Sequence, residues 1–352
     1  MKIKLAILGK DENYIKRLIA SFNAKYSDKI EIYSFTDEDI AFSVLDNKRI
    51  DVFLASERFK IDTSKIPKRC GFAYFVDASD IESFNNQRAV CKFQKADLIY
   101  KQILGIYSEN TNSVSGLRLN DENTKIIIFS SPCGGTGTSC AAAACAKYYA
   151  SIGKTLYLNL EKFGAADSFF TGEGSFSISD IIYALKSRKS NMSIKLESCV
   201  KQDISGLYFY SASQNALDMQ ELSAGAVIQL INELKLSALY DYIVLDMDFA
   251  MDKDTLKIFE QAHGIVWVGD GTAISNLKIR RAYDALSTIE MNKDISILGR
   301  TCLLYNKFSS KSSKAIENIG IRTIGGIPVY IHAAVNQIVD TISSMKIFDL
   351  IF

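Results

Sequence analysis

The chain has 352 residues, of which 48% are hydrophobic and 23% are charged, and its formal net charge is +1. This composition is typical of a folded globular protein with about two domains. A charge so close to zero excludes a global field that would attract nucleic acid or anionic lipid, and no apolar run reaches the ~18 residues of a membrane span. The seven cysteines contain no C-x-x-C pair, so we expect reduced, mostly buried thiols in a cytoplasmic protein.

The first 107 residues alternate between strand and helix patterns. Apolar runs predict strands at 3–9, 30–35, 50–55, 71–76 and 88–92, and helical spacing of apolar residues predicts helices at 12–26, 38–47 and 95–107. Strands that alternate with helices are typical of a parallel sheet covered on both faces. This half is therefore predicted to be a doubly wound α/β domain.

A polar segment at 108–124 lacks any periodicity and is the best candidate for a linker. Strand and helix patterns alternate again after it. We therefore predict a first domain at 1–107, a linker at 108–124 and a second domain at 125–352. The predicted fold class is α/β, with two doubly wound parallel-sheet domains.

The first domain resembles the receiver domains of response regulators in the order and spacing of its elements. Asp11 and Glu12 follow the first strand, as the acidic metal-binding pair of receivers does, and Lys92 follows the fifth. Where receivers carry the phosphoacceptor aspartate, this chain has Ala55 or Ser56. A hydroxyl cannot replace a carboxylate in aspartyl-phosphate chemistry, so we expect a pseudo-receiver used for docking or dimerisation. Polar groups that merely end strands are the alternative.

A glycine-rich loop opens the second domain. An apolar run at 125–130 predicts a buried strand, the glycines follow, and alanine-rich residues then predict a helix. This order is typical of phosphate binding, because loop amides and the positive end of a helix both attract anions. The residues expected to bind phosphate are Gly134, Gly135, Thr136, Gly137, Thr138, Ser139 and Cys140. A tight turn without a ligand is the alternative.

The second domain resembles the ParA/MinD family of ATPases. Its loop is similar to the deviant Walker A motif of that family, Lys-Gly-Gly-x-Gly-Lys-[Ser/Thr]-[Ser/Thr], but Cys133 and Thr138 stand at the two lysine positions. The apolar strand pattern that ends in Asp246 resembles a Walker B element. The resemblance implies that the domain binds ATP with Mg²⁺, and that Ser139 and Asp246 hold the metal directly or through water.

Three further segments carry the same resemblance. The run at 155–161 matches a family strand that ends Asp-x-Asp, with Asn159 and Glu161 in place of the aspartates. Asn306 matches the asparagine that contacts adenine, and Pro328 belongs to a Gly-x-Ile-Pro-like segment that lies against the base. The resemblance therefore implies that Asn306 and Pro328 bind the nucleotide, and that Glu161 is the candidate catalytic residue that helps to position water.

The segment at 162–167, Lys-Phe-Gly-Ala-Ala-Asp, resembles the CpaE/TadZ branch of this family, whose members carry a pseudo-receiver before the ATPase domain. The resemblance implies a cytoplasmic, ATP-binding homodimer that marks a cell pole. It also implies partners among the components of a tight-adherence pilus and secretion assembly. Two alternatives remain open, namely a cycling ParA/MinD-type ATPase and a response regulator with an ATPase-like output domain.

Loss of both lysines bears on hydrolysis more than on binding. Removing a preorganised cation from a phosphoryl-transfer site lowers the rate by roughly 10²–10³. Backbone amides and Mg²⁺ still hold the phosphates, so affinity suffers less. We therefore expect a degenerate P-loop ATPase that binds ATP and hydrolyses it slowly or not at all.

A group of basic residues and the carboxy-terminal tail bear on whether the protein binds nucleic acid or a membrane. A weak basic patch is formed by Lys278, Arg280, Arg281, Lys307, Lys311 and Lys314. Acidic neighbours and the near-neutral charge favour a solvated face, so no specific nucleic acid is expected. The tail at 335–352 has apolar residues at helical spacing but few basic ones, which favours packing against the domain or a partner, with at most peripheral membrane association.

Overall fold

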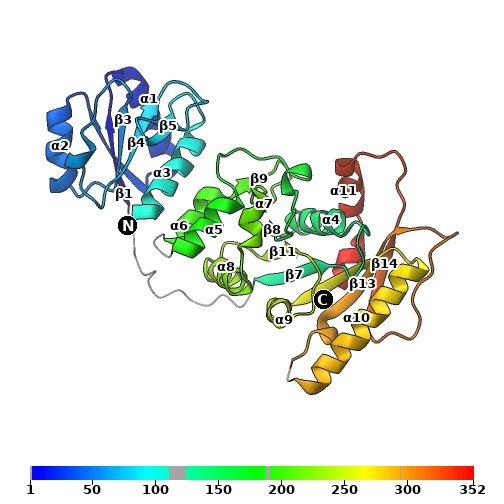
Figure 1. The fold of residues 1–352 in the computed structure, drawn as a ribbon. Coiled ribbons are helices and arrows are strands. Elements are labelled where there is room, and N and C mark those ends of the chain that lie inside the picture. Colours follow the sequence, from blue (N-terminus) through cyan, green and yellow to red (C-terminus); the bar gives the residue numbers. More distant parts are fainter. Residues whose placement is uncertain (1, 111–123, 188–190, 294) are drawn as a thin grey trace. The chain divides into compact units, whose positions relative to one another are not determined.

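The computed structural model describes residues 2–110, 124–187, 191–293 and 295–352 (Figure 1). The chain forms two compact units. Unit 1 contains Met1–Gly116 and Tyr183–Cys199, and unit 2 contains Leu117–Ile182 and Val200–Phe352. Each unit has one main sheet in which parallel pairing predominates, so the predicted α/β class with two parallel-sheet domains is confirmed.

The sheet of unit 1 is parallel except for a short hairpin at one edge. Its strand order is β2 (Ile30–Phe35), β1 (Ile3–Leu8), β3 (Val52–Ser56), β4 (Gly71–Val76), β6 (Gln87–Cys91) and β5 (Ser83–Phe84). The helical segments are α1 (Glu12–Tyr26), α2 (Glu38–Asn47), the 3₁₀ turn η1 (Thr63–Lys65), α3 (Ala96–Asn110) and α6 (Met192–Cys199). Helices α1 and α2 begin where predicted because the side chains of Asp11 and Asp37 accept hydrogen bonds from the first-turn amides.

Both faces of this sheet are buried, as is usual for parallel sheets. One apolar cluster lies between the sheet and helices α1 and α3, and a second cluster lies between the sheet and α2. The core strand β3 is buried along its whole length. This double burial explains why the strands read as continuous apolar runs.

Helix α6 comes from far along the chain and packs against α3. The backbone N–H of Asn191 donates to the carbonyl oxygen of Ser108 at 3.0 Å. Lys195 is only 2% exposed, and its ammonium lies 3.6 Å from the Glu109 carboxylate. No local sequence signal indicated that this segment joins the first unit.

The predicted linker falls largely on residues 111–123, which lie outside the described part of the chain. Helix α3 continues to Asn110, three residues beyond the predicted end; in this last turn Ser108 is fully buried, and its hydroxyl donates to the Gly105 carbonyl oxygen at 2.8 Å. The boundaries at 107 and 125 stay a prediction.

Unit 2 is built on a larger sheet, parallel except where β9 pairs antiparallel to β10. Its strand order is β14 (Arg322–Pro328), β13 (Thr301–Phe308), β12 (Gly264–Gly269), β7 (Lys125–Ser130), β11 (Tyr242–Asp246), β8 (Thr155–Asn159), β10 (Tyr208–Phe209) and β9 (Lys201–Gln202). Strands β12, β7, β11 and β8 are the central ones. The polar residues that follow them gather at one edge, because parallel strands end on the same side.

The remaining helical segments connect and cover these strands (Figure 1). They are α4 (Thr138–Ala150), η2 (Ala166–Ser168), α5 (Ile178–Ser187), α7 (Ala216–Gln220), α8 (Ala224–Leu236), α9 (Lys253–Phe259), α10 (Ala273–Asn292), η3 (Leu298–Arg300), α11 (Val335–Ser343) and η4 (Lys346–Leu350). Helix α5 belongs to unit 2 only as far as Ile182, and its last residues belong to unit 1.

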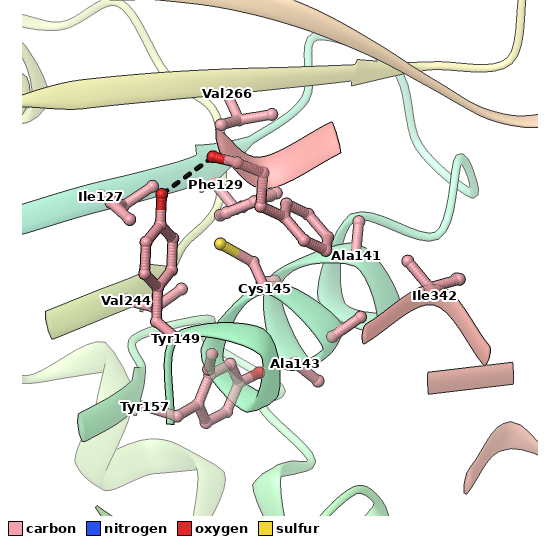
Figure 2. Close-up of a cluster of buried hydrophobic side chains, with 14 of the residues drawn as sticks. Ile127, Phe129, Ala141, Ala143, Cys145, Tyr149, Tyr157, Val244, Val266 and Ile342 are labelled. Atoms are coloured by element: carbon pink, nitrogen blue, oxygen red, sulfur yellow. Dashed lines mark hydrogen bonds between the residues drawn. The ribbon is translucent and has the colours of Figure 1, made fainter. Parts of the chain in front are cut away.

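Helix α4 lies in the middle of the unit 2 core. Its residues 141–146 are fully buried, and five of the six are alanine. Figure 2 shows Ala141 and Cys145 among apolar side chains of the central strands, including Phe129 and Val266. Small side chains let the helix lie close to the sheet, which fixes the position of its amino-terminal end.

The carboxy-terminal tail packs against the outer side of α4. Val339 and Ile342 of α11 are buried, and so is Phe348 of η4. The hydroxyl of Tyr149 donates to the Phe348 carbonyl oxygen at 2.9 Å (Figure 2), and Lys147 pairs with Asp340. Packing of the tail on its own domain, the interpretation that its composition favoured, is therefore confirmed.

All seven cysteines are free thiols, and all but Cys140 are buried, as the sequence predicted. Within the described residues, none of the helices has the length and apolarity needed to cross a bilayer.

Candidate functional site

The glycine loop joins β7 to α4 and leaves its amides available. Gly135 and Gly137 have φ values of +77° and +78°, a conformation that favours glycine, and Gly137 caps α4 in the left-handed region. In the described part of the chain, no group accepts a hydrogen bond from the backbone N–H of residues 134–140. These amides and the positive end of a 13-residue helix form a site suited to an anion.

Asn306 of β13 holds the loop in place through its side chain. Its side-chain amide donates to the Thr136 carbonyl oxygen at 2.8 Å and lies 3.3 Å from that of Gly137. Asn306 is 5% exposed, so a buried side chain holds the backbone of the loop at Thr136 and Gly137. The predicted contact of Asn306 with adenine stays a prediction.

Gly137→Ala should therefore damage the loop far more than Gly134→Ala. A Cβ on Gly137 would lie 2.4 Å from the amide nitrogen of Asn306, in a backbone conformation that alanine disfavours, whereas a Cβ on Gly134 meets nothing within 4 Å. We expect a loss of about 1–3 kcal/mol in the free energy of unfolding for Gly137→Ala and less than about 0.5 kcal/mol for Gly134→Ala. Chemical denaturation of both variants measures this, and equal losses would contradict the role of Asn306.

The two residues at the lysine positions are uncharged, and each contacts other groups of the protein. Cys133 is buried, with its sulfur 3.4 Å from both the hydroxyl and the carbonyl oxygen of Ser275 on α10. Thr138 lies at the start of α4, and its hydroxyl is 3.1 Å from that of Thr136. Neither side chain brings a positive charge to the loop.

A lysine from another strand does reach the loop. Lys307 follows Asn306 directly, and its ammonium donates to the Gly135 carbonyl oxygen at 2.8 Å. From the sequence, Lys307 was expected only in a weak basic patch. The signal that identifies its position is its adjacency to Asn306, which itself contacts the loop.

A polar cluster lies beside the first turn of α4. The hydroxyl of Ser139 donates to the Glu161 carboxylate at 3.1 Å, and the Asn159 amide lies 3.0 Å from the same oxygen. The Asn159 amide is also 3.1 Å from Asp246 Oδ2, to which the Tyr157 hydroxyl donates at 2.8 Å. The structure thus brings together the predicted residues Ser139, Glu161 and Asp246, and it adds Tyr157, which the sequence analysis did not single out.

Asp246 is the most unusual member of the cluster. It is 0% exposed, and its Oδ1 atom has no hydrogen-bond partner in the described part of the chain. Burial in the first place, and the nearby Glu161 carboxylate in the second, raise the pKa of the Asp246 carboxyl to about 8. A buried carboxylate with an unpartnered oxygen beside a hydroxyl and a second carboxylate offers the hard oxygen ligands that Mg²⁺ prefers. The residues present therefore fit the metal.

Pro328 lies at the exposed end of β14, next to β13. The end of β14 belongs to the same edge of the sheet as the ends of β13, β7, β11 and β8. The fold thus directs the glycine loop, Asn306, Glu161, Asp246 and Pro328 to one edge, which is where ligands bind in open α/β sheets.

The edge of the unit 1 sheet at which receivers carry their acidic site has different side chains in this protein. Ser56 ends β3, and the Lys92 ammonium lies 3.4 Å from its hydroxyl. Lys92 also forms an ion pair with Asp77 at 2.7 Å. The side chain of Asp11 accepts from the Tyr14 amide and caps α1. The described residues at the end of β3 therefore offer a hydroxyl where receivers offer a carboxylate.

Both units are similar to known proteins. Residues 1–108 match the family model of the TadZ-like receiver domain. Among solved structures, the chain is similar to a ParA family ATPase from Chlorobium tepidum TLS. The identity is 19%, the match covers 65% of this chain and 97% of that one, and the TM-score is 0.52.

Two other solved structures are similar at lower scores. A chain of the MinC:MinD cell division protein complex of Aquifex aeolicus matches with 17% identity over 64% of this chain and 93% of that one, at a TM-score of 0.49. The septum site-determining protein MinD complexed with Mg-ADP from Pyrococcus horikoshii OT3 matches with 14% identity over 62% and 94%, at a TM-score of 0.47. No curated protein matches the chain. Residues 1–108 thus match a TadZ-like receiver domain and unit 2 has the ParA-type fold, and both findings support the resemblance to CpaE/TadZ-type proteins.

Proposed function

We propose that unit 2 binds ATP with Mg²⁺ and hydrolyses it slowly or not at all. One observation carries the proposal, namely a glycine loop with available amides beside a fully buried carboxylate that has an unpartnered oxygen. An anion at the loop and a cation at the carboxylate are the two halves of a metal–nucleotide complex. The family of unit 1 and the fold of unit 2 support the same conclusion.

Each residue of the site has a separate task in this proposal. The amides of residues 134–140 bind the β- and γ-phosphates, and Ser139 and Asp246 hold Mg²⁺ directly or through water. The metal neutralises phosphate charge when it is bound. Glu161 orients the attacking water, and Asn306 and Pro328 lie at the edge where the base is held.

Slow turnover follows from the uncharged side chains of Cys133 and Thr138 at the two lysine positions. In phosphoryl transfer, catalysis depends on positive charge placed in advance around the phosphate that moves. Neither a thiol packed on Ser275 nor a hydroxyl bonded to Thr136 supplies it. The protein then acts as a scaffold loaded with nucleotide, and the alternative is a cycling ATPase.

Binding and turnover are measured on the same purified full-length protein. We expect ATP–Mg²⁺ to raise the melting temperature, because a ligand that binds only the folded state stabilises it, and we expect phosphate release well below one per second. AMP serves as the control for contacts to the β- and γ-phosphates. Absence of both a thermal shift and calorimetric heat at millimolar ATP rules out the proposal, and turnover of one per second or more favours the cycling ATPase.

The cellular role proposed for the scaffold is to mark a cell pole and to recruit components of a tight-adherence pilus assembly. It acts as a homodimer to which the pseudo-receiver contributes. The TadZ-like receiver domain supports this role. Light scattering with and without ATP–Mg²⁺ tests the dimer, and a fluorescent fusion with a piliation assay tests the role. A monomer under all conditions, or a diffuse fusion in normally piliated cells, argues against it.

A further inference from the structure

The nucleotide site proposed above has lost two lysines, yet a third lysine lies on its loop. We propose that Lys307 supplies, for binding of the β- and γ-phosphates and not for the transfer step, the positive charge that Cys133 and Thr138 do not supply. The inference rests on the proposed ATP site, and it names the residue of this chain that recognises the polyphosphate.

The position of Lys307 is fixed by the residue before it. Asn306 is buried and bonded to the loop through the Thr136 carbonyl oxygen, so the backbone of Lys307 begins beside the glycines. Lys307 has a φ of +57°, a conformation that lysine rarely adopts. The strand β13 is irregular here, with a shift in its pairing to β14 between Tyr305 and Phe308. Local backbone distortion thus directs this side chain.

The side chain of Lys307 lies across the glycine loop. Its Cε atom is 3.5 Å from the place where a Cβ of Gly137 would stand, and its ammonium is 2.8 Å from the Gly135 carbonyl oxygen.

The Gly135 carbonyl is a neutral acceptor, and Lys307 is exposed. A phosphate oxygen that carries charge is a stronger acceptor for an ammonium than a carbonyl is. A polyphosphate bound to the loop amides therefore offers Lys307 a better partner within reach of its flexible stem. Gly134 and Gly135 have open space on their side-chain side, which leaves room for that ligand.

The direct test compares three variants of the full-length protein. Lys307→Met removes the charge and keeps both a side chain of similar length and a Cβ on the unusual backbone conformation, whereas Lys307→Arg keeps the charge. Lys311→Met is the matched control, because Lys311 is an exposed lysine four residues further on whose backbone N–H, at 3.4 Å, donates to the Ser309 hydroxyl. The measurements are calorimetric affinities for ATP–Mg²⁺, ADP–Mg²⁺ and AMP, together with the melting temperature without ligand.

We expect Lys307→Met to weaken ATP–Mg²⁺ binding by about 10- to 100-fold, with a smaller loss for ADP and no loss for AMP. Lys307→Arg and Lys311→Met should each stay within about threefold of wild type. Equal affinities of Lys307→Met and Lys311→Met, in a wild type that binds ATP, overturn the inference and leave the proposed function standing. A wild type that binds no ATP overturns the proposed function instead. A loss that is the same for ATP and AMP shows that Lys307 only shapes the loop.

A second substitution separates charge from loop structure. Thr138→Lys restores a lysine at the family position. If Lys307 stands in for it, Thr138→Lys should raise ATP affinity at least tenfold more in the Lys307→Met background than in wild type, because the two lysines serve one phosphate group. The same gain in both backgrounds shows that the two positions act independently and contradicts the inference.

Discussion

Asp246→Asn should weaken ATP–Mg²⁺ binding at least 100-fold and, in the absence of nucleotide, stabilise the protein at alkaline pH. The loss of binding follows because an amide is a neutral and poor ligand for Mg²⁺, which prefers carboxylate and water oxygens. The gain in stability follows because the substitution removes a buried carboxylate with an unpartnered oxygen. A residue kept for binding at a cost in stability is a common feature of functional sites.

The gain in stability has a defined pH window. The pKa of the Asp246 carboxyl is about 8 in the folded protein and 3.8 in the reference state, so the unfolded chain releases a proton that the folded protein retains. Wild type therefore loses stability relative to Asp246→Asn as the pH rises between these two values. We expect a difference of about 1–3 kcal/mol above pH 8, which shrinks toward zero near pH 4.

Thermal or chemical denaturation from pH 4 to 9, without nucleotide, measures this difference. Asp248→Asn is the matched control, because Asp248 lies two residues further on and is exposed. It should change stability by less than about 0.5 kcal/mol at any pH. An Asp246→Asn protein that is less stable than wild type at pH 9 would show that the carboxylate has a favourable structural partner.

Phe348→Ala should cause the largest loss of stability, about 3–5 kcal/mol. Phe348 is 0% exposed, and its ring lies 6.5 Å from that of Phe129 and 5.6 Å from that of Tyr148, measured between centroids. Alanine would leave a cavity between the tail, α4 and β7. For a unit of this size the melting temperature should fall by about 10 °C.

Phe352→Ala is the control for Phe348→Ala, because Phe352 is 50% exposed. Its loss should stay below about 1.5 kcal/mol. Calorimetric melting curves of both variants make the comparison. Similar losses for the two would mean that the tail does not brace α4, and the position of the phosphate loop would then depend on the sheet alone.

Local patterns predicted much of the fold. Helices α1 and α2 begin where an aspartate caps the first turn, and strands such as β7 and β11 are short apolar runs with buried residues throughout their interiors. The candidate site was also readable in part, since Ser139, Glu161 and Asp246 follow predicted elements that end at the same edge of a parallel sheet.

The features that could not be predicted from the sequence depend on tertiary contacts. Nothing local marks α6 as a partner of α3, and a buried Lys195 contradicts the usual position of lysine at the surface. The contact of Lys307 with Gly135 joins residues that are 172 positions apart. It depends on an irregular strand pairing that periodicity does not reveal. Likewise, the inward position of Cys133 depends on Ser275 of a helix far along the chain.

The path of the chain between the two units determines whether proteolysis or truncation can separate them. Among the described residues, 2–110 belong to unit 1, 124–182 to unit 2, 183–187 and 191–199 to unit 1, and those from 200 on to unit 2. A single proteolytic cut between residues 111 and 123 would therefore nick the protein without releasing its amino-terminal fragment, because α3 would remain packed on α6. Deletion of the first 110 residues would likewise leave α6 with an uncovered apolar surface, so a clean dissection of this protein has to remove two segments of the chain.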